Sequence, residues 1–189
     1  MILFINACVR EGSRTLRLAK RVLSHLEGEV QECDLEREGL LPLTARTLAQ
    51  RDAILREGRL DDPMLRYARE FAAAEEIVLA APYWDLSFPA SVKTYFEHIN
   101  VTGVTFSYGQ DGRPIGHCRA KRLIYVTTAG GPILPPNHGF AYVRDLAAGF
   151  YGIPEIALFS AQMLDVIGMD VEAILREAEG DIEAYFAKN

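Results

Sequence analysis

The sequence predicts an α/β protein: a doubly wound parallel sheet with helices on both faces. Two observations carry this prediction. Five short apolar runs recur along the chain, and segments with helical spacing of apolar residues separate them. Continuously apolar runs are typical of strands buried on both faces of a parallel sheet. Their regular alternation with helices implies βαβ units with right-handed crossovers.

The expected strands and helices follow from these two patterns. The five runs, rich in Ile, Val and Leu, predict strands at residues 2–7, 29–35, 76–81, 122–128 and 155–161. Apolar residues spaced i, i+3, i+4, i+7 predict one buried stripe on each helix. They predict helices that include residues 19–26, 92–99, 143–150 and 171–186.

The connection between the second and third strands is long. It predicts a polar helix at about residues 45–57 and another helix that begins with Asp62 as N-cap and Pro63 in its first turn. The charged run at residues 34–38 is predicted to be a solvated segment. Because no repeat, linker or low-complexity tract interrupts the chain, residues 1–189 are predicted to form a single domain.

Composition excludes several classes of function. A net charge of −6 argues against nucleic acid or an anionic membrane as the main partner. Three cysteines without a CxxC pair, and four histidines without metal spacing, predict neither a disulfide framework nor a metal site. No apolar run approaches the roughly 20 residues of a membrane span. The first residues read as a strand and not as a signal peptide, so a cytoplasmic location is expected.

Ligands of such sheets bind beyond the carboxyl ends of the strands. The loop after the first strand leads into a helix at Ser13, Arg14 and Thr15, where free N–H groups and the helix dipole favour an anion. Arg10 adds positive charge. The alternative is that Ser13 only caps the helix. Neither GxGxxG nor GxxxxGK[ST] is present, so a small phosphomonoester fits better than a dinucleotide or a nucleoside triphosphate.

The loops after the third and fourth strands have the chemistry to hold a flat ring. The first of them carries the chain's only Trp between two prolines, and the second carries a Gly-Gly pair that lets backbone approach a ligand. A phosphate at the first loop and a ring between the other two is the arrangement of FMN in the flavodoxin-like strand order 2-1-3-4-5. The residues concerned are Pro82, Tyr83, Trp84, Asp85, Leu86, Thr128, Ala129, Gly130 and Gly131.

Three stretches make this resemblance specific: "APYWDLSFPASVKTYFEHI" (81–99), "GVTFSYGQDGRPIG" (103–116) and "TTAGG" (127–131). Through them the chain resembles, essentially end to end, the FMN-dependent NAD(P)H azoreductase and quinone reductase family of the flavodoxin-like superfamily. It departs from the family pattern at Cys8, Asp85 and Ala129, where the family commonly has Ser, Asn and Arg. Cys8 is interpreted as a small apolar residue near the strand end.

The resemblance implies an oxidoreductase that passes electrons from NADH or NADPH to quinones, azo compounds or similar small acceptors. The two substrates would take turns on one FMN, and no catalytic side chain is required because the cofactor carries the redox chemistry. It also implies a homodimer in which Phe106 and Tyr108 line the substrate site of the partner; the alternative is a β-hairpin flap over the chain's own site. His138, in the loop after the fourth strand, is either substrate-lining or a plain loop residue.

Two other functions stay open from the sequence. One is a flavodoxin-type electron carrier, although the Thr/Ser-x-Thr-Gly-x-Thr phosphate loop of flavodoxins is absent here. The other is an FMN-binding module without turnover of its own. Reduction of the bound flavin by NADH distinguishes both from a reductase. In all three, the N–H groups of Trp84 and Asp85 are expected to face the flavin edge.

Overall fold

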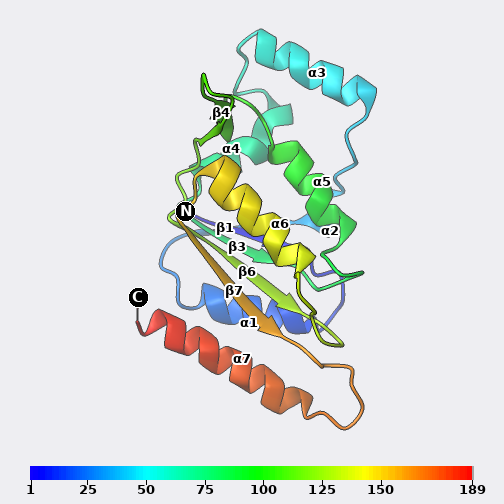
Figure 1. Ribbon diagram of the computed structural model, residues 1–189. Coiled ribbons are helices and arrows are strands. Elements are labelled where there is room, and N and C mark those ends of the chain that lie inside the picture. Colours follow the sequence, from blue (N-terminus) through cyan, green and yellow to red (C-terminus); the bar gives the residue numbers. More distant parts are fainter. Residues whose placement is uncertain (189) are drawn as a thin grey trace.

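The computed structural model describes residues 1–188, which form three layers with a parallel sheet in the middle (Figure 1). All five runs predicted as strands are strands of this sheet: β1 (Ile2–Asn6), β2 (Val30–Asp34), β3 (Glu76–Ala80), β6 (Arg122–Thr128) and β7 (Glu155–Ala161). The strand order is β2-β1-β3-β6-β7. The expected numbering, 2-1-3-4-5, did not count two short strands, β4 and β5, that lie between β3 and β6 in the chain.

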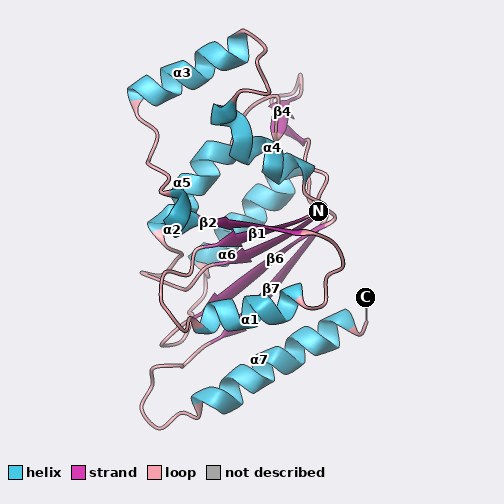
Figure 2. Cartoon of the chain, turned by 180° about the vertical axis from the view of Figure 1, so that it is seen from behind, coloured by secondary structure: helices cyan, strands magenta, loops and turns pink. Residues whose placement is uncertain are grey.

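Helices cover both faces of the sheet (Figure 2). One face carries α1 (Arg14–Leu23) and α7 (Val171–Phe186), whose apolar stripes pack on side chains of β1, β3, β6 and β7. The other face carries α2 (Leu35–Glu38), α4 (Arg66–Ala73), α5 (Ala90–Ile99) and α6 (His138–Leu146). The sheet therefore has an apolar core on each side, as its continuously apolar strands predict.

A small hairpin lies apart from the main sheet. Its strands, β4 (Phe106–Tyr108) and β5 (Pro114–Gly116), pair antiparallel. The hairpin is anchored at Gly116, where a Cβ atom would lie 2.2 Å from the carbonyl of Tyr151. Tyr151 ends η2 (Ala147–Tyr151), a π-helical turn that continues α6. Only glycine at position 116 allows the two backbones to come this close.

The chain between β2 and β3 differs from the expectation in two places. In the charged run at residues 34–38, Glu36 and Arg37 are exposed as expected, but Asp34 and Glu38 are half-buried and bonded within the protein. Asp34 caps α2, and Glu38 accepts hydrogen bonds from Arg66 and Tyr67, both at 2.6 Å. The helix expected to begin at Pro63 starts as a 3₁₀ turn, η1 (Pro63–Leu65), before α4. Asp62 caps it as predicted, by accepting from the N–H of Met64 at 3.0 Å.

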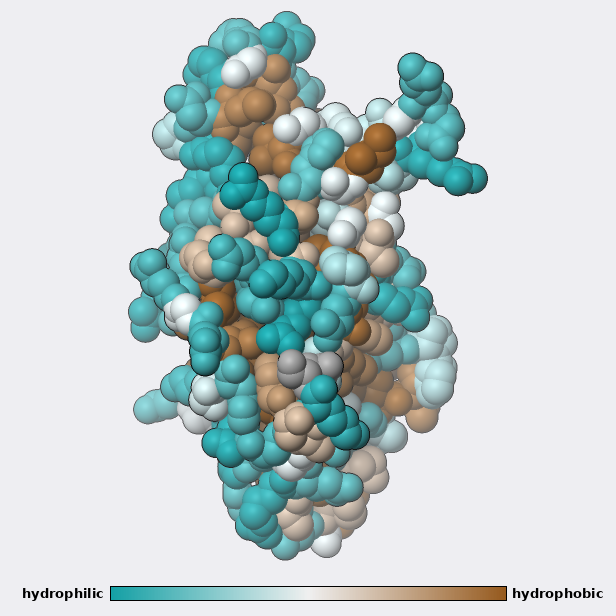
Figure 3. All heavy atoms as spheres, turned by 90° about the vertical axis from the view of Figure 1, so that its left-hand side faces the viewer, coloured by the Kyte–Doolittle hydropathy of each residue, from teal (hydrophilic) through white to brown (hydrophobic). Residues whose placement is uncertain are grey.

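The polar helix α3 (Ala45–Arg56) lies at the edge of the molecule, away from the sheet (Figures 1 and 2). Ile54 is its one buried residue. Figure 3 shows apolar side chains gathered at the end of the molecule where α3 and the hairpin lie. Exposed apolar residues on or next to these segments are Leu48, Leu60, Tyr108 and Ile115. Within residues 1–188, no helix combines the length and apolar character needed to cross a membrane.

Candidate functional site

A cavity of about 370 Å³ opens at the carboxyl ends of β1, β3 and β6. Three loops form it, as the topology of a doubly wound sheet requires. Ten of the thirteen residues predicted to hold the cofactor line this cavity: Arg10, Ser13, Arg14, Thr15, Pro82, Tyr83, Trp84, Thr128, Ala129 and Gly130. The volume lies within the usual range of small-molecule sites, roughly 300–1,000 Å³.

The first loop presents backbone N–H groups to this cavity. Ser13 is the N-cap of α1, and its hydroxyl oxygen accepts from the N–H of Leu16 at 3.2 Å. The N–H of Arg17 donates to the carbonyl of Ser13 at 3.1 Å. The N–H groups of Arg14 and Thr15 have no acceptor among residues 1–188. Ser13 is therefore an N-cap, as the alternative interpretation held, and the same helix end retains two free donors for an anion.

The end of β1 fixes the shape of this loop. The Asn6 amide donates to Glu32 at 2.9 Å, and its oxygen accepts from the N–H of Cys8 at 3.0 Å. Gly12 turns the chain with φ +69°, a conformation that glycine adopts without strain. Burial raises the pKa of the Cys8 thiol, so Cys8 stays a neutral side chain of the cavity wall.

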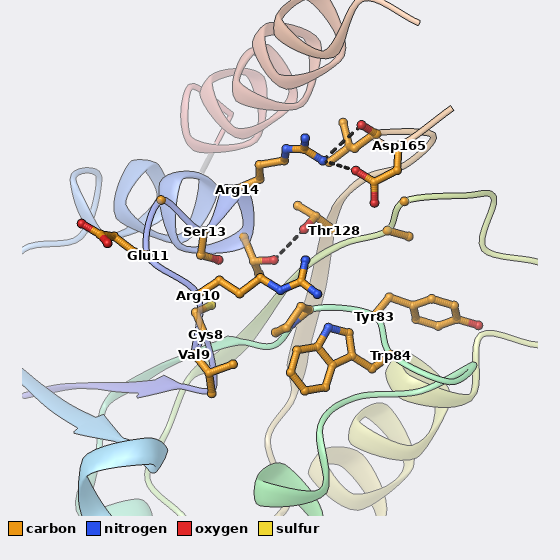
Figure 4. Close-up of a pocket in the computed structure, with 16 residues that line it drawn as sticks. Cys8, Val9, Arg10, Glu11, Ser13, Arg14, Tyr83, Trp84, Thr128 and Asp165 are labelled. Carbon is orange, nitrogen blue, oxygen red and sulfur yellow. Dashed lines mark hydrogen bonds and ion pairs between the residues drawn. The ribbon is translucent and has the colours of Figure 1, made fainter. Parts of the chain in front are cut away.

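Two threonines join the first loop to the third. The hydroxyl oxygens of Thr15 and Thr128 lie 2.6 Å apart (Figure 4). The N–H of Tyr83 donates to the carbonyl of Thr128 at 2.9 Å, which ties the second loop to the same strand end. The three loops are thus held together by hydrogen bonds at β6, and the cavity lies between them.

Arg10 and Trp84 approach the cavity from opposite loops. In Figure 4 the Arg10 side chain extends across the cavity toward Thr128 and Trp84. Trp84 is 37% exposed, so a large part of its ring is available to a ligand. An aromatic ring beside a cationic side chain and free N–H groups suits a flat, anionic ligand.

The second loop differs from the expectation. Trp84 and Ser87 exchange two backbone hydrogen bonds, of 3.0 and 2.8 Å. Asp85 and Leu86 between them have φ of +49° and +67°, as in a type I′ turn. The N–H of Trp84 therefore donates to Ser87 and cannot face a flavin edge. Asp85 and Leu86 form the exposed tip of the turn and do not line the cavity.

Four other predicted site residues lie elsewhere. Gly131 does not line the cavity, although its carbonyl accepts from Met163 at 3.2 Å. Phe106 is buried in the hairpin against Tyr108 and Phe150, and Tyr108 is 56% exposed beside it. His138 starts α6 and lines a second cavity between α5 and α6, with Ser87, Phe88, Lys93, Ala141, Tyr142 and Asp145.

Six residues that line the cavity were not among the predicted cofactor-binding residues: Cys8, Val9, Glu11, Gly12, Leu164 and Asp165. The first four come from the loop already singled out, so their positions could have been included. Leu164 and Asp165 come from the loop between β7 and α7. The strand order could have predicted them, because β7 neighbours β6 and its carboxyl end lies at the same edge of the sheet.

The residues present fit FMN on their own chemistry. Free helix N–H groups and Arg10 suit a phosphate, the Thr15 and Thr128 hydroxyls suit a polar chain, and Trp84 and Tyr83 suit a ring. Among residues 1–188, no group of three or more His, Cys, Asp or Glu side chains is placed to hold a metal ion. The donor set thus matches a phosphorylated aromatic cofactor.

Comparisons with known proteins agree with this class of site. Residues 1–186 match the protein family described as having a flavodoxin-like fold. The chain therefore belongs to this family.

Within that family, the chain is similar to FMN-dependent NADH:quinone oxidoreductases. It is 34% identical to one from Coprothermobacter proteolyticus, over 96% of each chain. It is 36% identical to the FMN-dependent NADH:quinone oxidoreductase 2 of Clostridium acetobutylicum, over 93% of this chain and 92% of the relative. At these identities and coverages the chain belongs to the same family as these oxidoreductases.

Solved structures share the fold. An azoreductase from Bacillus anthracis superimposes with a TM-score of 0.85 at 21% identity, over 100% of this chain and 99% of that chain. A FMN-dependent NADH-azoreductase from the same species, solved in complex with FMN, gives 0.81 at 18% identity, over 99% and 97%. At such identities the likeness shows the fold alone.

Proposed function

We propose that this protein is an FMN-dependent oxidoreductase that passes electrons from NADH to quinones, azo compounds or similar small acceptors. The observation that carries the proposal is the cavity at the carboxyl ends of β1, β3 and β6, with its free helix N–H groups at one end and Trp84 at the other. The family relationship to FMN-dependent NADH:quinone oxidoreductases supports it.

The phosphate of FMN would be held at the start of α1. The N–H groups of Arg14 and Thr15 would donate to it beside the Ser13 hydroxyl, and the Arg10 side chain, which extends across the cavity, would add positive charge. A dianion gains there from charge-assisted hydrogen bonds and from the positive end of the helix dipole. This end of the cavity would therefore fix the position of the cofactor.

The ring would lie against the second and third loops. Pro82, Tyr83 and Trp84 form one wall, and Thr128, Ala129 and Gly130 form another. When bound, FMN supplies the redox chemistry by taking hydride from reduced nicotinamide and giving electrons to an acceptor. The chain's part is to orient the ring, keep water from its covered face and leave the other face open.

One open face serves both substrates, so NADH and the acceptor would bind in turn, in a ping-pong order. NADH is the favoured donor because the relatives are named for it. The acceptor's identity within the quinone and azo classes is set by what completes the open side of the cavity. The cytoplasm, which supplies NADH, is the expected location.

We further propose a homodimer as the active form. Tyr108 is 56% exposed on the hairpin and does not line the cavity of its own chain. Phe106 packs under it, with ring centroids 5.4 Å apart, and holds it in place. An aromatic side chain displayed in this way is suited to complete the acceptor site of a second copy.

The test begins with purified protein and FMN. We expect FMN to bind. Under anaerobic conditions, excess NADH should bleach the flavin band, and a quinone should then restore it. The double variant Ser13→Ala/Thr15→Ala should weaken FMN by about 1.5–3 kcal/mol for each hydrogen bond lost to a charged group of the cofactor. Ser24→Ala, at the other end of α1, is the control because its hydroxyl donates to the Arg21 carbonyl and does not line the cavity.

Two results would contradict the proposal. Absence of FMN binding to the unmodified protein would exclude a flavoenzyme. Bound FMN that NADH does not reduce would instead indicate an electron carrier or a binding module. If the double variant kept full FMN affinity, the phosphate site would lie elsewhere in the chain.

A further inference from the structure

A second cavity, of about 570 Å³, lies between α5 and α6, which pack side by side on one face of the sheet (Figure 1). Two half-buried aromatic side chains, Phe88 and Tyr142, form part of its wall, with ring centroids 5.6 Å apart. Phe96 packs against both rings, at 6.3 and 5.8 Å, and holds them in place. The cavity has the size of a small-molecule site, and none of its residues lines the proposed FMN site.

Polar groups with unused hydrogen-bonding capacity border the aromatic wall. The Lys93 amine donates to Glu97 at 2.5 Å, which leaves two of its three N–H donors. This hydrogen bond raises the pKa of Lys93, so the amine stays charged. The Ser87 hydroxyl and the His138 ring make no hydrogen bond within residues 1–188. All three groups can donate to a phosphate.

The negative charge of this cavity is compensated. Asp145 is the acidic residue of the lining, and the Arg144 guanidinium donates to its carboxylate at 2.9 and 3.0 Å. Lys93 and His138 therefore face an anion without a free carboxylate beside them. An aromatic wall next to cationic and hydroxyl donors suits a nucleotide, whose base stacks and whose phosphates accept hydrogen bonds.

One turn separates this cavity from the proposed flavin site. Trp84 lines the first cavity, Ser87 lines the second, and the two residues exchange backbone hydrogen bonds of 3.0 and 2.8 Å. The Cα atoms at the two ends of such a turn are less than about 7 Å apart. Asp85 and Leu86, between them, are exposed. A ligand that stacks beside Trp84 can therefore cross the turn and enter the second cavity.

We propose that the second cavity binds the adenosine diphosphate end of NADH while the nicotinamide lies over the flavin ring. The inference rests on the proposed function, because it assumes that NADH reduces FMN held in the first cavity. There the FMN phosphate takes the free N–H groups of α1 and the Arg10 side chain, so the diphosphate of NADH needs other donors. The second cavity supplies them, together with an aromatic wall for the adenine ring.

The first experiment compares NADH with reduced nicotinamide mononucleotide, which lacks the adenylate half, in the anaerobic reduction of FMN-loaded protein. Both donors carry the same nicotinamide ring, so any difference reports the remainder of the molecule. The second-order rate constant for flavin reduction should be at least about tenfold higher for NADH, because binding of a remote substrate part speeds the reaction.

The double variant Lys93→Ala/His138→Ala removes the cationic donors of the second cavity. It should lower the rate constant for NADH by about fivefold or more, keep that for the mononucleotide within about twofold, and leave FMN affinity unchanged. Lys20→Ala is the matched control, because Lys20 is exposed on α1 and lines neither cavity.

A binding measurement gives a readout that does not depend on turnover. ADP is titrated calorimetrically into FMN-loaded protein, in which FMN keeps ADP away from the start of α1. ADP should bind to the unmodified protein and to Lys20→Ala alike, and about fivefold more weakly to Lys93→Ala/His138→Ala.

The outcomes separate this inference from the proposed function. Equal rate constants for the two donors with the unmodified protein overturn the inference and leave the function standing. A double variant that slows both donors alike would show that the second cavity acts on the flavin through the turn, and the inference is then wrong. If NADH does not reduce bound FMN, the proposed function fails and this inference with it. Should the double variant not fold, the donor comparison and the ADP titration of the unmodified protein decide.

Discussion

At the scale of single residues, the turn that carries Trp84 is unusual in its two central residues. Type I′ turns favour Asn and Gly, since both central positions need positive φ. This chain places Asp85 and Leu86 there, and Leu86 has φ +67° with its side chain 64% exposed. No burial of Leu86 offsets the strain. The turn is held by its ends, where Trp84 and Ser87 exchange both backbone hydrogen bonds.

Leu86→Gly should therefore stabilise the protein. Removing a Cβ from the left-handed conformation relieves about 1–2 kcal/mol of strain, and the greater freedom of glycine in the unfolded chain takes part of this back. We expect a net gain of about 0.5–1 kcal/mol in the free energy of unfolding, measured by urea denaturation. Leu134→Gly is the control, because Leu134 is 65% exposed in a loop without positive φ. An equal loss in both variants would show that the turn is unstrained.

The same turn shows what the sequence could and could not predict about the site. Its place after β3, and the aromatic wall that it gives the cavity, follow from the order of elements and from residues 82–84 alone. The direction of the Trp84 N–H cannot be predicted from these residues, because it depends on the carbonyl of Ser87. Asp165 was missed for a related reason. Its partners Arg14 and Gly130 are distant in sequence, and only the folded chain brings them together.

At the scale of elements, α1 and α7 are joined by a row of ion pairs along one face. Arg17 bonds Glu172 and Glu179, with shortest distances of 2.8 Å, and Arg21 and His25 both reach Glu183. The Arg14–Asp165 pair is the first rung of this row. Exposed ion pairs contribute little one by one, so the apolar stripe beneath them carries most of the packing.

This row predicts acid sensitivity at Glu183. The hydrogen bond from His25, and the charge of Arg21, lower the pKa of the Glu183 carboxyl below its ordinary value of 4.5. A lowered pKa in the folded state favours the folded protein while the group is ionised. The contribution is therefore present above pH 4.5 and is lost as the pH falls below it.

Urea denaturation across the acid range checks this. The stability difference between the unmodified protein and Glu183→Gln should be constant near neutral pH and should shrink as the pH falls through the lowered pKa. Glu177→Gln, on the same helix but without an ion pair among residues 1–188, should show a difference that does not change with pH. Parallel curves for both variants would contradict the role of Glu183.

The strands and helices were predictable where their pattern lies within one short stretch of sequence. Continuous apolar runs gave all five strands, and β6 and β7 begin and end where expected. The helix α2 was missed because its four residues are too few for a periodic pattern, and because the partners of Glu38 are on α4. The 3₁₀ start at Pro63 depends on how α4 meets the core, which spacing alone does not encode.

At the scale of the whole molecule, the two segments that project from the sandwich are α3 and the β4–β5 hairpin. Both lie at one end, and the exposed apolar residues there include Leu48, Tyr108 and Ile115. An end of this kind exposes apolar surface to water unless something covers it. A second copy of the chain is the cover that the proposed homodimer supplies.

The dimer makes a prediction about Tyr108. Sedimentation at micromolar concentration should give twice the 21.0 kDa chain mass. Tyr108→Ala should raise KM for a quinone by several-fold through loss of an aromatic contact worth about 0.5–1.5 kcal/mol, and leave FMN affinity unchanged. Tyr108→Phe, which keeps the exposed ring, is the matched control and should leave KM nearly unchanged. A fully active monomer would exclude a shared site.

The position of α3 has a consequence for how the protein opens. Few contacts hold this helix to α5 and the core: Ile54 is buried, Leu55 packs partly against the core, and Arg51 donates to the carbonyl of Glu97 at 3.1 Å. Its amides should therefore exchange with solvent deuterium through a local opening that leaves the sheet closed, at a lower free energy than global unfolding. Such an independent unit can change in length or sequence over evolution without altering the cavity at the carboxyl ends of β1, β3 and β6. The chain thus keeps its most adjustable segment apart from its most constrained one.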